Sequence, residues 1–277
     1  MGVRTDLALE EQELRQAEGT SLPGVRCREH QEHGIRITEV EITDEAGAEA
    51  LHKPKGRYVT LEADAEQIRC SPSLCAGVLA NILTEMLPPE GPFLVVGLGN
   101  RAVTPDALGP LALAQVLATR HLRSALPELF GSFREVSTIP TGVLGDTGLE
   151  SAEIVESLVQ RTRPRCVLAI DALASSRPER LCRSIQVTDA GIAPGSGVHN
   201  NRHPLCKDGL GVPVLGIGVP TVCDLRSLMD TKAEMIVTPG KIDAQVSDLA
   251  RILGAAVNQA LHPEIAPEDL AEFVGSM

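Results

Sequence analysis

The strongest constraint on the fold is an apolar run that ends in glycine and leads to an aspartate. Residues 93–98 (FLVVGL) have the composition of a buried strand. Gly97 and Gly99 allow a sharp turn and a close approach to the backbone, and Pro105 fixes the backbone just before Asp106. We therefore expect Asp106 in a loop at the carboxyl end of a strand, where open α/β sheets bind their ligands.

A second aspartate follows an apolar run of the same kind. Residues 166–170 (CVLAI) predict another buried strand, which ends at Asp171. A single aspartate at a strand end is usually a helix cap or a turn residue. Two aspartates at one edge of a sheet are stronger evidence for a functional site. Neighbouring carboxylates cannot both ionise readily, and they can divide acid and base roles. Such a pair can activate water against a peptide carbonyl or hold a divalent metal, and the residues alone leave both open.

The rest of the chain alternates between strand and helix patterns. We expect strands at residues 133–138, 184–188 and 212–218, and helices at 65–87 (interrupted at Pro72), 110–122, 148–161 and 242–261. This alternation is typical of a three-layer α/β fold with a mostly parallel twisted sheet and helices on both faces. Strands at 34–42 and 56–62 predict a hairpin-like N-terminal β elaboration at the sheet edge. No linker follows residue 90, so we expect one domain.

Composition excludes several classes of protein. Aromatic residues make up 2% of the 277 residues, and the net charge is −12; both argue against nucleic-acid and membrane binding. The seven cysteines include no C-x-x-C pair, which indicates reduced thiols in a cytoplasm rather than disulfides or structural zinc. No apolar run approaches the roughly 20 residues that span a bilayer, and the N-terminus has no targeting pattern.

The composition of the N-terminal segment indicates little regular structure. Residues 1–30 are polar and acidic, with Glu10, Glu11, Glu13 and Glu18 close together. A short helix over residues 6–17 would have only a thin apolar face. Composition therefore favours a mobile N-terminal arm.

Motifs for other chemistries are weak or absent. Gly97 and Gly99 are not followed by the third glycine of a dinucleotide fingerprint, and the carboxylate of Asp106 would repel a phosphate. A nucleotide or small-molecule binding module is therefore kept only as an alternative. No G-x-S-x-G or H-E-x-x-H motif is present. His199 and His203 share a loop that contains glycine and proline, so we expect exposed loop histidines and no metal site.

Several short blocks, in order along the chain, resemble the germination proteases, the endopeptidases that degrade small acid-soluble spore proteins in spore-forming bacteria. The resemblance runs from the N-terminus to His262 and rests on the blocks VRTDLALE (3–10), GRYVTLE (56–62), VVGLGN (95–100), VTPDALGP (103–110), AIDALA (169–174) and PGSG (194–197). A more distant resemblance links the G-x-G-N sequence and the two acidic positions to the hydrogenase maturation endopeptidases, which grip a substrate metal there.

The resemblance implies an endopeptidase in which Asp106 and Asp171 activate water and protonate the leaving amine. From geometry we add the backbone amides of Gly97, Gly99 and Asn100 as candidate oxyanion donors. The family also implies a zymogen, a homotetramer, a location in the cytoplasm of the spore core, and spore proteins as substrates, without direct contact to nucleic acid or membrane. No cofactor is expected. The alternatives are a protease that holds a divalent metal with the same aspartates and a processing peptidase of the hydrogenase-maturation type.

The N-terminal block also predicts how a zymogen would mature. Residues 1–6 would be a propeptide, removed by a cut between Asp6 and Leu7, and residues 7–277 would form the protease domain. The segment matches the pattern that the family cleaves, an acidic residue followed by a large apolar residue and alanine. The chain departs from the family in two places: it lacks an insertion between Val222 and Val237, and His199 interrupts the glycine-rich loop.

Overall fold

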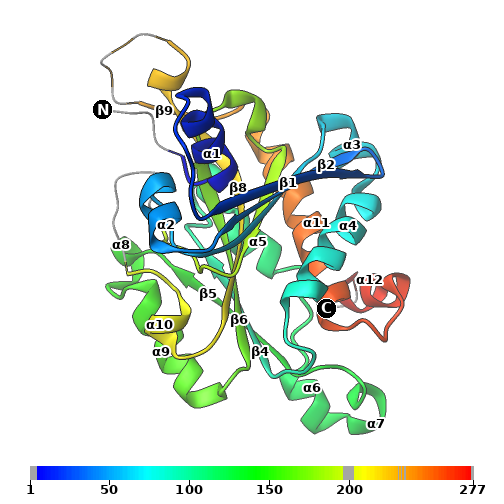
Figure 1. Ribbon diagram of the computed structural model, residues 1–277. Coiled ribbons are helices and arrows are strands. Elements are labelled where there is room, and N and C mark those ends of the chain that lie inside the picture. Colours follow the sequence, from blue (N-terminus) through cyan, green and yellow to red (C-terminus); the bar gives the residue numbers. More distant parts are fainter. Residues whose placement is uncertain (1–4, 196–202, 230, 232, 234, 276–277) are drawn as a thin grey trace.

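The protein is built around one large mixed sheet. The computed structural model describes residues 5–195, 203–229, 231, 233 and 235–275 (Figure 1). Within these residues the sheet has nine strands in the order β1-β2-β3-β7-β8-β6-β4-β5, with β9 paired to β8. The strands are β1 (Val25–Glu32), β2 (Ile35–Ile42), β3 (Gly56–Glu62), β4 (Phe93–Leu98), β5 (Val136–Gly142), β6 (Cys166–Ser175), β7 (Ser184–Thr188), β8 (Val214–Asp224) and β9 (Ile236–Val237).

The sheet has a parallel core and an antiparallel extension. Strands β8, β6, β4 and β5 run parallel to their neighbours within this group, whereas β1, β2, β3 and β7 pair antiparallel and join the core through β7 and β8. The predicted α/β class with a parallel core is confirmed, and so is the N-terminal β elaboration. The sequence missed β1, because it lies at the sheet edge and most of its residues are exposed, which leaves no apolar alternation to detect.

Helices cover both faces of the parallel core. Figure 1 shows α4 and α11 on one side of the sheet and α9 on the other. The helices are α1 (Ala8–Ala17), α2 (Glu45–Leu51), α3 (Ala65–Cys70), α4 (Pro72–Met86), α5 (Leu108–Leu113), α6 (Arg120–Ala125), α7 (Pro127–Phe130), α8 (Leu144–Thr147), α9 (Ser151–Thr162), α10 (Lys207–Leu210), α11 (Ile242–Leu261) and α12 (Pro267–Gly275). As predicted from Pro72, a break separates α3 from α4.

The apolar core lies on both faces of the central strands. In β4, Phe93 and Val95 pack into the cluster that includes α4 and α11, and Leu94 and Val96 pack into the cluster that includes α9. Successive side chains of a strand point to opposite faces, so a strand covered on both sides is apolar at every position. This is why residues 93–98 form a continuous apolar run rather than an alternating one.

The predicted helix over residues 110–122 is wrong in length. The helix α5 ends at Leu113, and α6 begins only at Arg120. Between them, the buried side chain of Asn258 accepts a hydrogen bond from the Leu117 amide at 2.9 Å and donates one to the Gln115 carbonyl at 2.8 Å. An amide from α11 thus satisfies backbone groups that a longer helix would have used for itself, and this partner is remote in sequence.

The N-terminal segment is anchored, and the prediction of a mobile arm is wrong for its described part. Leu7 and Ala8 are fully buried, and α1 lies against the sheet (Figure 1). The carboxylate of Glu10 is buried as well and accepts hydrogen bonds from Ser175 and Ser176 at the end of β6. Composition counted Glu10 as a solvated charge because its partners are more than 160 positions away in the chain.

His262, at the end of α11, gives the fold a dependence on pH. Its ring is 2% exposed, and Nδ1 accepts a hydrogen bond from the Arg134 amide. Burial, and then the charge of Arg134, lower the pKa of His262 from 6.5 to about 4. The folded protein therefore holds this imidazole neutral where the unfolded chain would protonate it.

We predict that the free energy of unfolding falls as the pH is lowered from about 6.5 to about 4. Over this range the unfolded chain binds a proton at His262 that the folded protein does not, which removes about 3 kcal/mol by the end of the range. Urea unfolding at a series of pH values would measure it. The free energy of unfolding should depend less on pH in His262→Asn than in the wild-type protein. It should keep the wild-type dependence in His121→Asn, whose side chain is exposed. The same dependence on pH in all three proteins would contradict the prediction.

Candidate active site

Asp106 is held by a tight loop between β4 and α5. It ends a 3₁₀ turn that begins at Thr104. The Asn100 amide donates to its Oδ2 at 2.7 Å. Gly99 has a φ of +104°, and a Cβ there would lie 2.1 Å from the Asp106 carbonyl oxygen. Only glycine therefore lets the backbone pass this close to the aspartate.

A contact from β8 fixes the same loop to the sheet. The Thr221 hydroxyl donates to the Pro105 carbonyl oxygen at 2.7 Å. Thr221 is 1% exposed, so water cannot easily replace this hydrogen bond. The position of Asp106 is thus determined by a strand that lies more than 100 residues later in the chain. Sequence reasoning missed Thr221, which carries no motif of its own.

Asp171 lies inside β6 rather than at the end of a strand. The prediction that the strand stops at residue 170 is wrong, because β6 continues to Ser175 and stays paired with β8 as far as Cys223. Asp171 is 4% exposed, and its Oδ1 accepts a hydrogen bond from the Ala172 amide at 2.9 Å. The second aspartate is therefore more buried and more firmly held than a strand-end loop would have made it.

Asp106 and Asp171, which the sequence analysis placed at one edge of the sheet, line one cavity. Its volume is about 390 Å³, and the N-terminal residue Asp6 also lines it. Four apolar side chains on or next to the segments that line it are exposed: Val103 and Leu149 outside helices and strands, Leu144 at the start of α8, and Ile236 in β9. Val103 and Ile236 belong to the lining itself. The cavity thus combines a carboxyl pair with apolar surface, which is suited to a chain segment with apolar side chains.

The glycine-rich turn before Asp106 has a supporting role in this structure. Gly97 packs against α5, where a Cβ would lie 2.7 Å from the Gly109 carbonyl oxygen. Gly99 lines the cavity, and the Asn100 amide is engaged by Asp106. The oxyanion role assigned to Gly97, Gly99 and Asn100 stays a prediction, and for Asn100 it would require that the bond to Asp106 be released.

A row of three residues crosses the sheet at Asp171. Gly218 in β8 is in register with Asp171 in β6 on one side and with Gln186 in β7 on the other. Residues in register share a face of the sheet, so Gln186 and Asp171 point to the same side across a glycine. Their Cα atoms are therefore about 10 Å apart. Gln186 is 5% exposed, and its only signal in the sequence was a polar position within a predicted strand.

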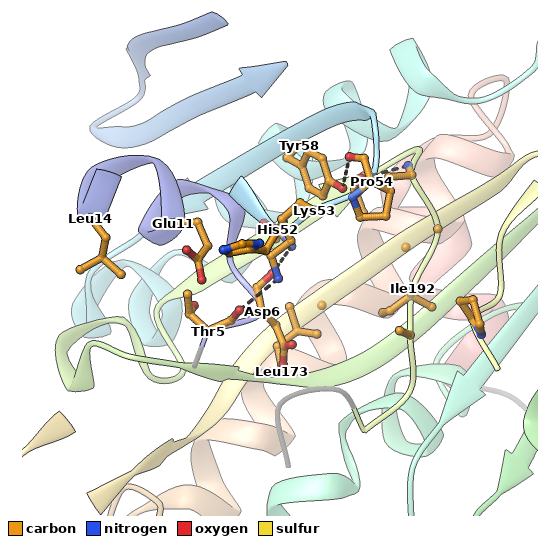
Figure 2. Close-up of a pocket in the computed structure, with 18 of the residues that line it drawn as sticks. Thr5, Asp6, Glu11, Leu14, His52, Lys53, Pro54, Tyr58, Leu173 and Ile192 are labelled. Carbon is orange, nitrogen blue, oxygen red and sulfur yellow. Dashed lines mark hydrogen bonds between the residues drawn. The ribbon is translucent and has the colours of Figure 1, made fainter. Parts of the chain in front are cut away.

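A larger cavity of about 790 Å³ lies over the antiparallel side of this row (Figure 2). It is lined by Gln186, Gly218 and the half-buried Lys53, among others. The two cavities share Asp6, Leu173 and Ala193. The N-terminal segment therefore lies at the boundary between the aspartate pair and a second, adjoining space.

Metal-ligand chemistry has limited support in the described residues. They contain no group of three or more His, Cys, Asp or Glu side chains placed to hold a metal ion. An ion at Asp106 and Asp171 would need water, backbone or substrate oxygens to complete its shell. Of the two loop histidines, His203 is exposed as expected, and His199 lies outside the described residues. In the part of the chain that was searched, no helix has the length and hydropathy to cross a bilayer.

Comparison with known proteins gives a consistent result. A family model described as germination protease matches residues 3–233. The chain is 39% identical to the germination protease of Caldanaerobacter subterraneus subsp. tengcongensis, covering 99% of this chain and 98% of the relative. It is 36% identical to that of Clostridium perfringens, with 98% and 99% covered, and 42% identical to that of Priestia megaterium, with 84% and 67% covered.

The alignments also show that this chain is short. The one with the Caldanaerobacter protein extends over 321 positions, more than the 277 residues of this chain. The relative therefore carries residues that are absent here, in keeping with the missing insertion expected between Val222 and Val237. In this chain β8 and β9 pair directly across that connection, through Cys223 and Val237.

We predict that Gly99→Ala destabilises the protein by about 1–3 kcal/mol, because a side chain at this positive φ is strained and overlaps the Asp106 backbone. Chemical denaturation would measure the change. Gly77→Ala is the matched control: this glycine lies within α4 with nothing within 4 Å of an added Cβ, so the substitution should be neutral or stabilise by up to about 1 kcal/mol. Equal effects at both positions would contradict the prediction.

Proposed function

The chain belongs to the germination protease family, and we propose that it is an endopeptidase that degrades small acid-soluble spore proteins during germination. The observation that carries the proposal is that Asp106, from the loop after β4, and Asp171, from β6, line one cavity. Exposed apolar residues such as Val103 and Ile236 supply contacts for the side chains of an extended substrate. The family name supports peptide hydrolysis, and the identity of the substrate rests on the resemblance.

The carboxyl pair has the chemistry that peptide hydrolysis needs. One carboxylate removes a proton from a water molecule in the cavity, and the water oxygen attacks the carbonyl carbon of the substrate. The other carboxyl group gives its proton to the amide nitrogen, and the C–N bond then breaks to release an amine and an acid. The loop contacts of Asp106 and the strand position of Asp171 hold both groups in place before substrate arrives.

We propose in addition that the chain is made as a zymogen and removes residues 1–6. Residues 1–4 lie outside the described residues. Asp6 lines the cavity with the two catalytic aspartates, and Leu7 and Ala8 are fully buried behind it. In this proposal the cut acts on a segment that already lies at the site, rather than on a free tail, and the chain from Leu7 onwards stays anchored afterwards.

Assembly and location are further parts of the proposal. The resemblance supports a homotetramer in the cytoplasm of the spore core, with spore proteins as its substrates. The net charge of −12 supports the expectation that the enzyme acts on these proteins without binding nucleic acid or membrane itself. The acidic surface would reduce competition from the DNA that such substrates coat.

We predict that Asp106→Asn and Asp171→Asn each lower the turnover of a spore-protein substrate by on the order of 10²–10⁴-fold. The amide is nearly isosteric with the carboxylate, so packing is kept and proton transfer is lost. Gel analysis of substrate over time would measure turnover, and circular dichroism would confirm folding. Asp208→Asn is the matched control, because Asp208 is exposed on α10. A folded Asp171→Asn protein with wild-type turnover would remove Asp171 from the mechanism.

The same assay separates the proposed mechanism from the metal-dependent alternative. A chelator added to the wild-type protein should leave turnover unchanged if the two carboxyl groups act on water directly. If Asp106 and Asp171 hold a catalytic ion instead, the chelator should abolish cleavage and an added divalent metal should restore it. Loss of cleavage with the chelator and its recovery with metal would replace the carboxyl-pair mechanism with a metal-dependent one in which Asp106 and Asp171 are the metal ligands.

We predict that the full-length protein cuts itself between Asp6 and Leu7 and does so faster at mildly acidic pH, because a catalytic carboxyl pair works when one member holds a proton. Incubation at pH values from about 5 to about 8, which span carboxyl-pair and histidine titrations, followed by N-terminal sequencing, would detect the product. It should begin at Leu7 and be absent in Asp106→Asn. Full substrate turnover by a protein that keeps Met1–Asp6 would contradict the zymogen proposal.

A further inference from the structure

The residues Thr5 and Asp6 occupy a defined place on the strand that carries Asp171. The Asp6 amide donates to the Ala174 carbonyl oxygen at 2.9 Å, and the Ala174 amide donates to Oδ2 of Asp6 at 2.8 Å. Both the backbone and the side chain of Asp6 are therefore bound by one residue of β6. Thr5 is 7% exposed, so this is a docked segment rather than a chance surface contact.

A lysine from the antiparallel side of the molecule reaches the same segment. Lys53 follows α2, and its Nζ donates to the Thr5 carbonyl oxygen at 3.0 Å; Figure 2 shows Lys53 beside Thr5 and Asp6. Burial lowers the pKa of Lys53, while the carboxylates of Asp6, Glu11 and Glu10 act in the opposite direction. The lysine thus loses solvation in this cavity, and Asp6 is one of the charges that offset the loss.

Gln186 holds the peptide bond that follows Asp6. Its Nε2 donates to the Asp6 carbonyl oxygen at 3.3 Å, and its Oε1 accepts from the Ala8 amide at 2.8 Å. One side chain therefore bridges the two sides of the Asp6–Leu7 bond. Because Gln186 and Asp171 point to the same side of the sheet across Gly218, the bond is held over the row that contains the buried aspartate.

We propose that Lys53, Gln186 and the Ala174 amide form the subsite for an acidic residue on the amino side of the scissile bond. The inference rests on the proposed proteolytic function, and it deepens that function by naming the residues that select the substrate. Asp6 fills the subsite in this structure. When residues 1–6 leave, the Ala174 amide loses the Asp6 carboxylate, and Lys53 loses the Thr5 carbonyl oxygen and the nearby negative charge of Asp6. An aspartate or glutamate of an incoming chain then takes the place of Asp6. Gln186 then binds the carbonyl oxygen of that residue.

The charge pattern of the site supports a carboxylate rather than a neutral side chain. The neighbouring acidic residue Glu10 is already bound to Ser175, Ser176 and Arg180, and so is not available to neutralise Lys53 fully. The Ala174 amide donates to one oxygen of this side chain, and the positive charge of Lys53 lies near enough to attract a carboxylate. A carboxylate is favoured over an amide here, because it carries a negative charge and both of its oxygens accept.

The first test needs no enzymatic activity and uses the full-length chain. Hydrogen exchange of the Asp6 amide reports how firmly the segment is docked. Lys53→Met should speed this exchange about 10-fold or more in the wild-type background and less in an Asp6→Asn background, because the attraction between the lysine and the carboxylate is then already absent. Lys53→Arg should retain most of the protection. Lys55→Met is the matched control, since Lys55 is exposed and pairs with Glu45. Equal effects of Lys53→Met in both backgrounds would overturn the proposal.

The second test measures specificity on two peptides that copy residues 3–12, one with aspartate and one with asparagine at the position of Asp6. Wild-type protein should favour the aspartate peptide in kcat/KM by roughly 10- to 100-fold, and Lys53→Met should reduce this ratio towards 1. Gln186→Met should slow cleavage of both peptides alike, because it contacts a carbonyl that they share. A wild-type ratio retained in Lys53→Met would overturn the subsite.

The two tests distinguish failure of the inference from failure of the proposed function. If wild-type protein cleaves neither peptide nor a spore-protein substrate, the proposed function fails, and the exchange experiment still decides whether Lys53 binds the carboxylate. If wild-type protein cleaves both and Lys53→Met leaves the peptide ratio unchanged, the function stands and the subsite is wrong. Unchanged turnover of both peptides in Gln186→Met would remove Gln186 from the site.

Discussion

The buried carboxylate of Glu10 is the interaction on which the site depends most. It joins α1 to the end of β6 through Ser175 and Ser176, and Arg180, which also binds Glu13 and Glu62, balances its charge. Breaking a buried, hydrogen-bonded charge network costs several kcal/mol, because the partners are left buried and unpaired. The anchor starts only four residues after Asp6, so it fixes where the N-terminal segment meets the cavity.

The site lies where the parallel strands of the sheet meet the antiparallel strands. The parallel half supplies Asp171 and the loop that carries Asp106, and the antiparallel extension supplies Gln186 and, through the connection after α2, Lys53. Glycine is required at position 218 between these two groups of strands, because a Cβ there would lie 2.4 Å from the Leu173 side chain. The Leu173 side chain thus fills the space that a side chain at position 218 would need.

The site residues of this chain are held in place without the insertion that longer relatives carry. In this chain β8 pairs directly with β9, and the residues around this pairing, such as Met235 and Ile236, are exposed. The aspartate pair, the Thr221 contact that supports it and the docked residues Thr5 and Asp6 are nevertheless all present in this chain. The contacts that hold Asp106 and Asp171 in this chain therefore form without such an insertion.

Local sequence determined the elements whose signal is local. The continuous apolar runs at 93–98 and 166–170 fixed two doubly covered strands, Pro72 fixed the break between α3 and α4, and the glycines before Asp106 fixed its loop. Only tertiary structure decided the remainder: that Asp171 lies within a strand, that Glu10 and Leu7 are buried, and that Gln186, Thr221 and Lys53 converge on the site. Each of these depends on a partner far away in the chain, and neither composition nor periodicity carries information about which distant residue will satisfy a buried polar group.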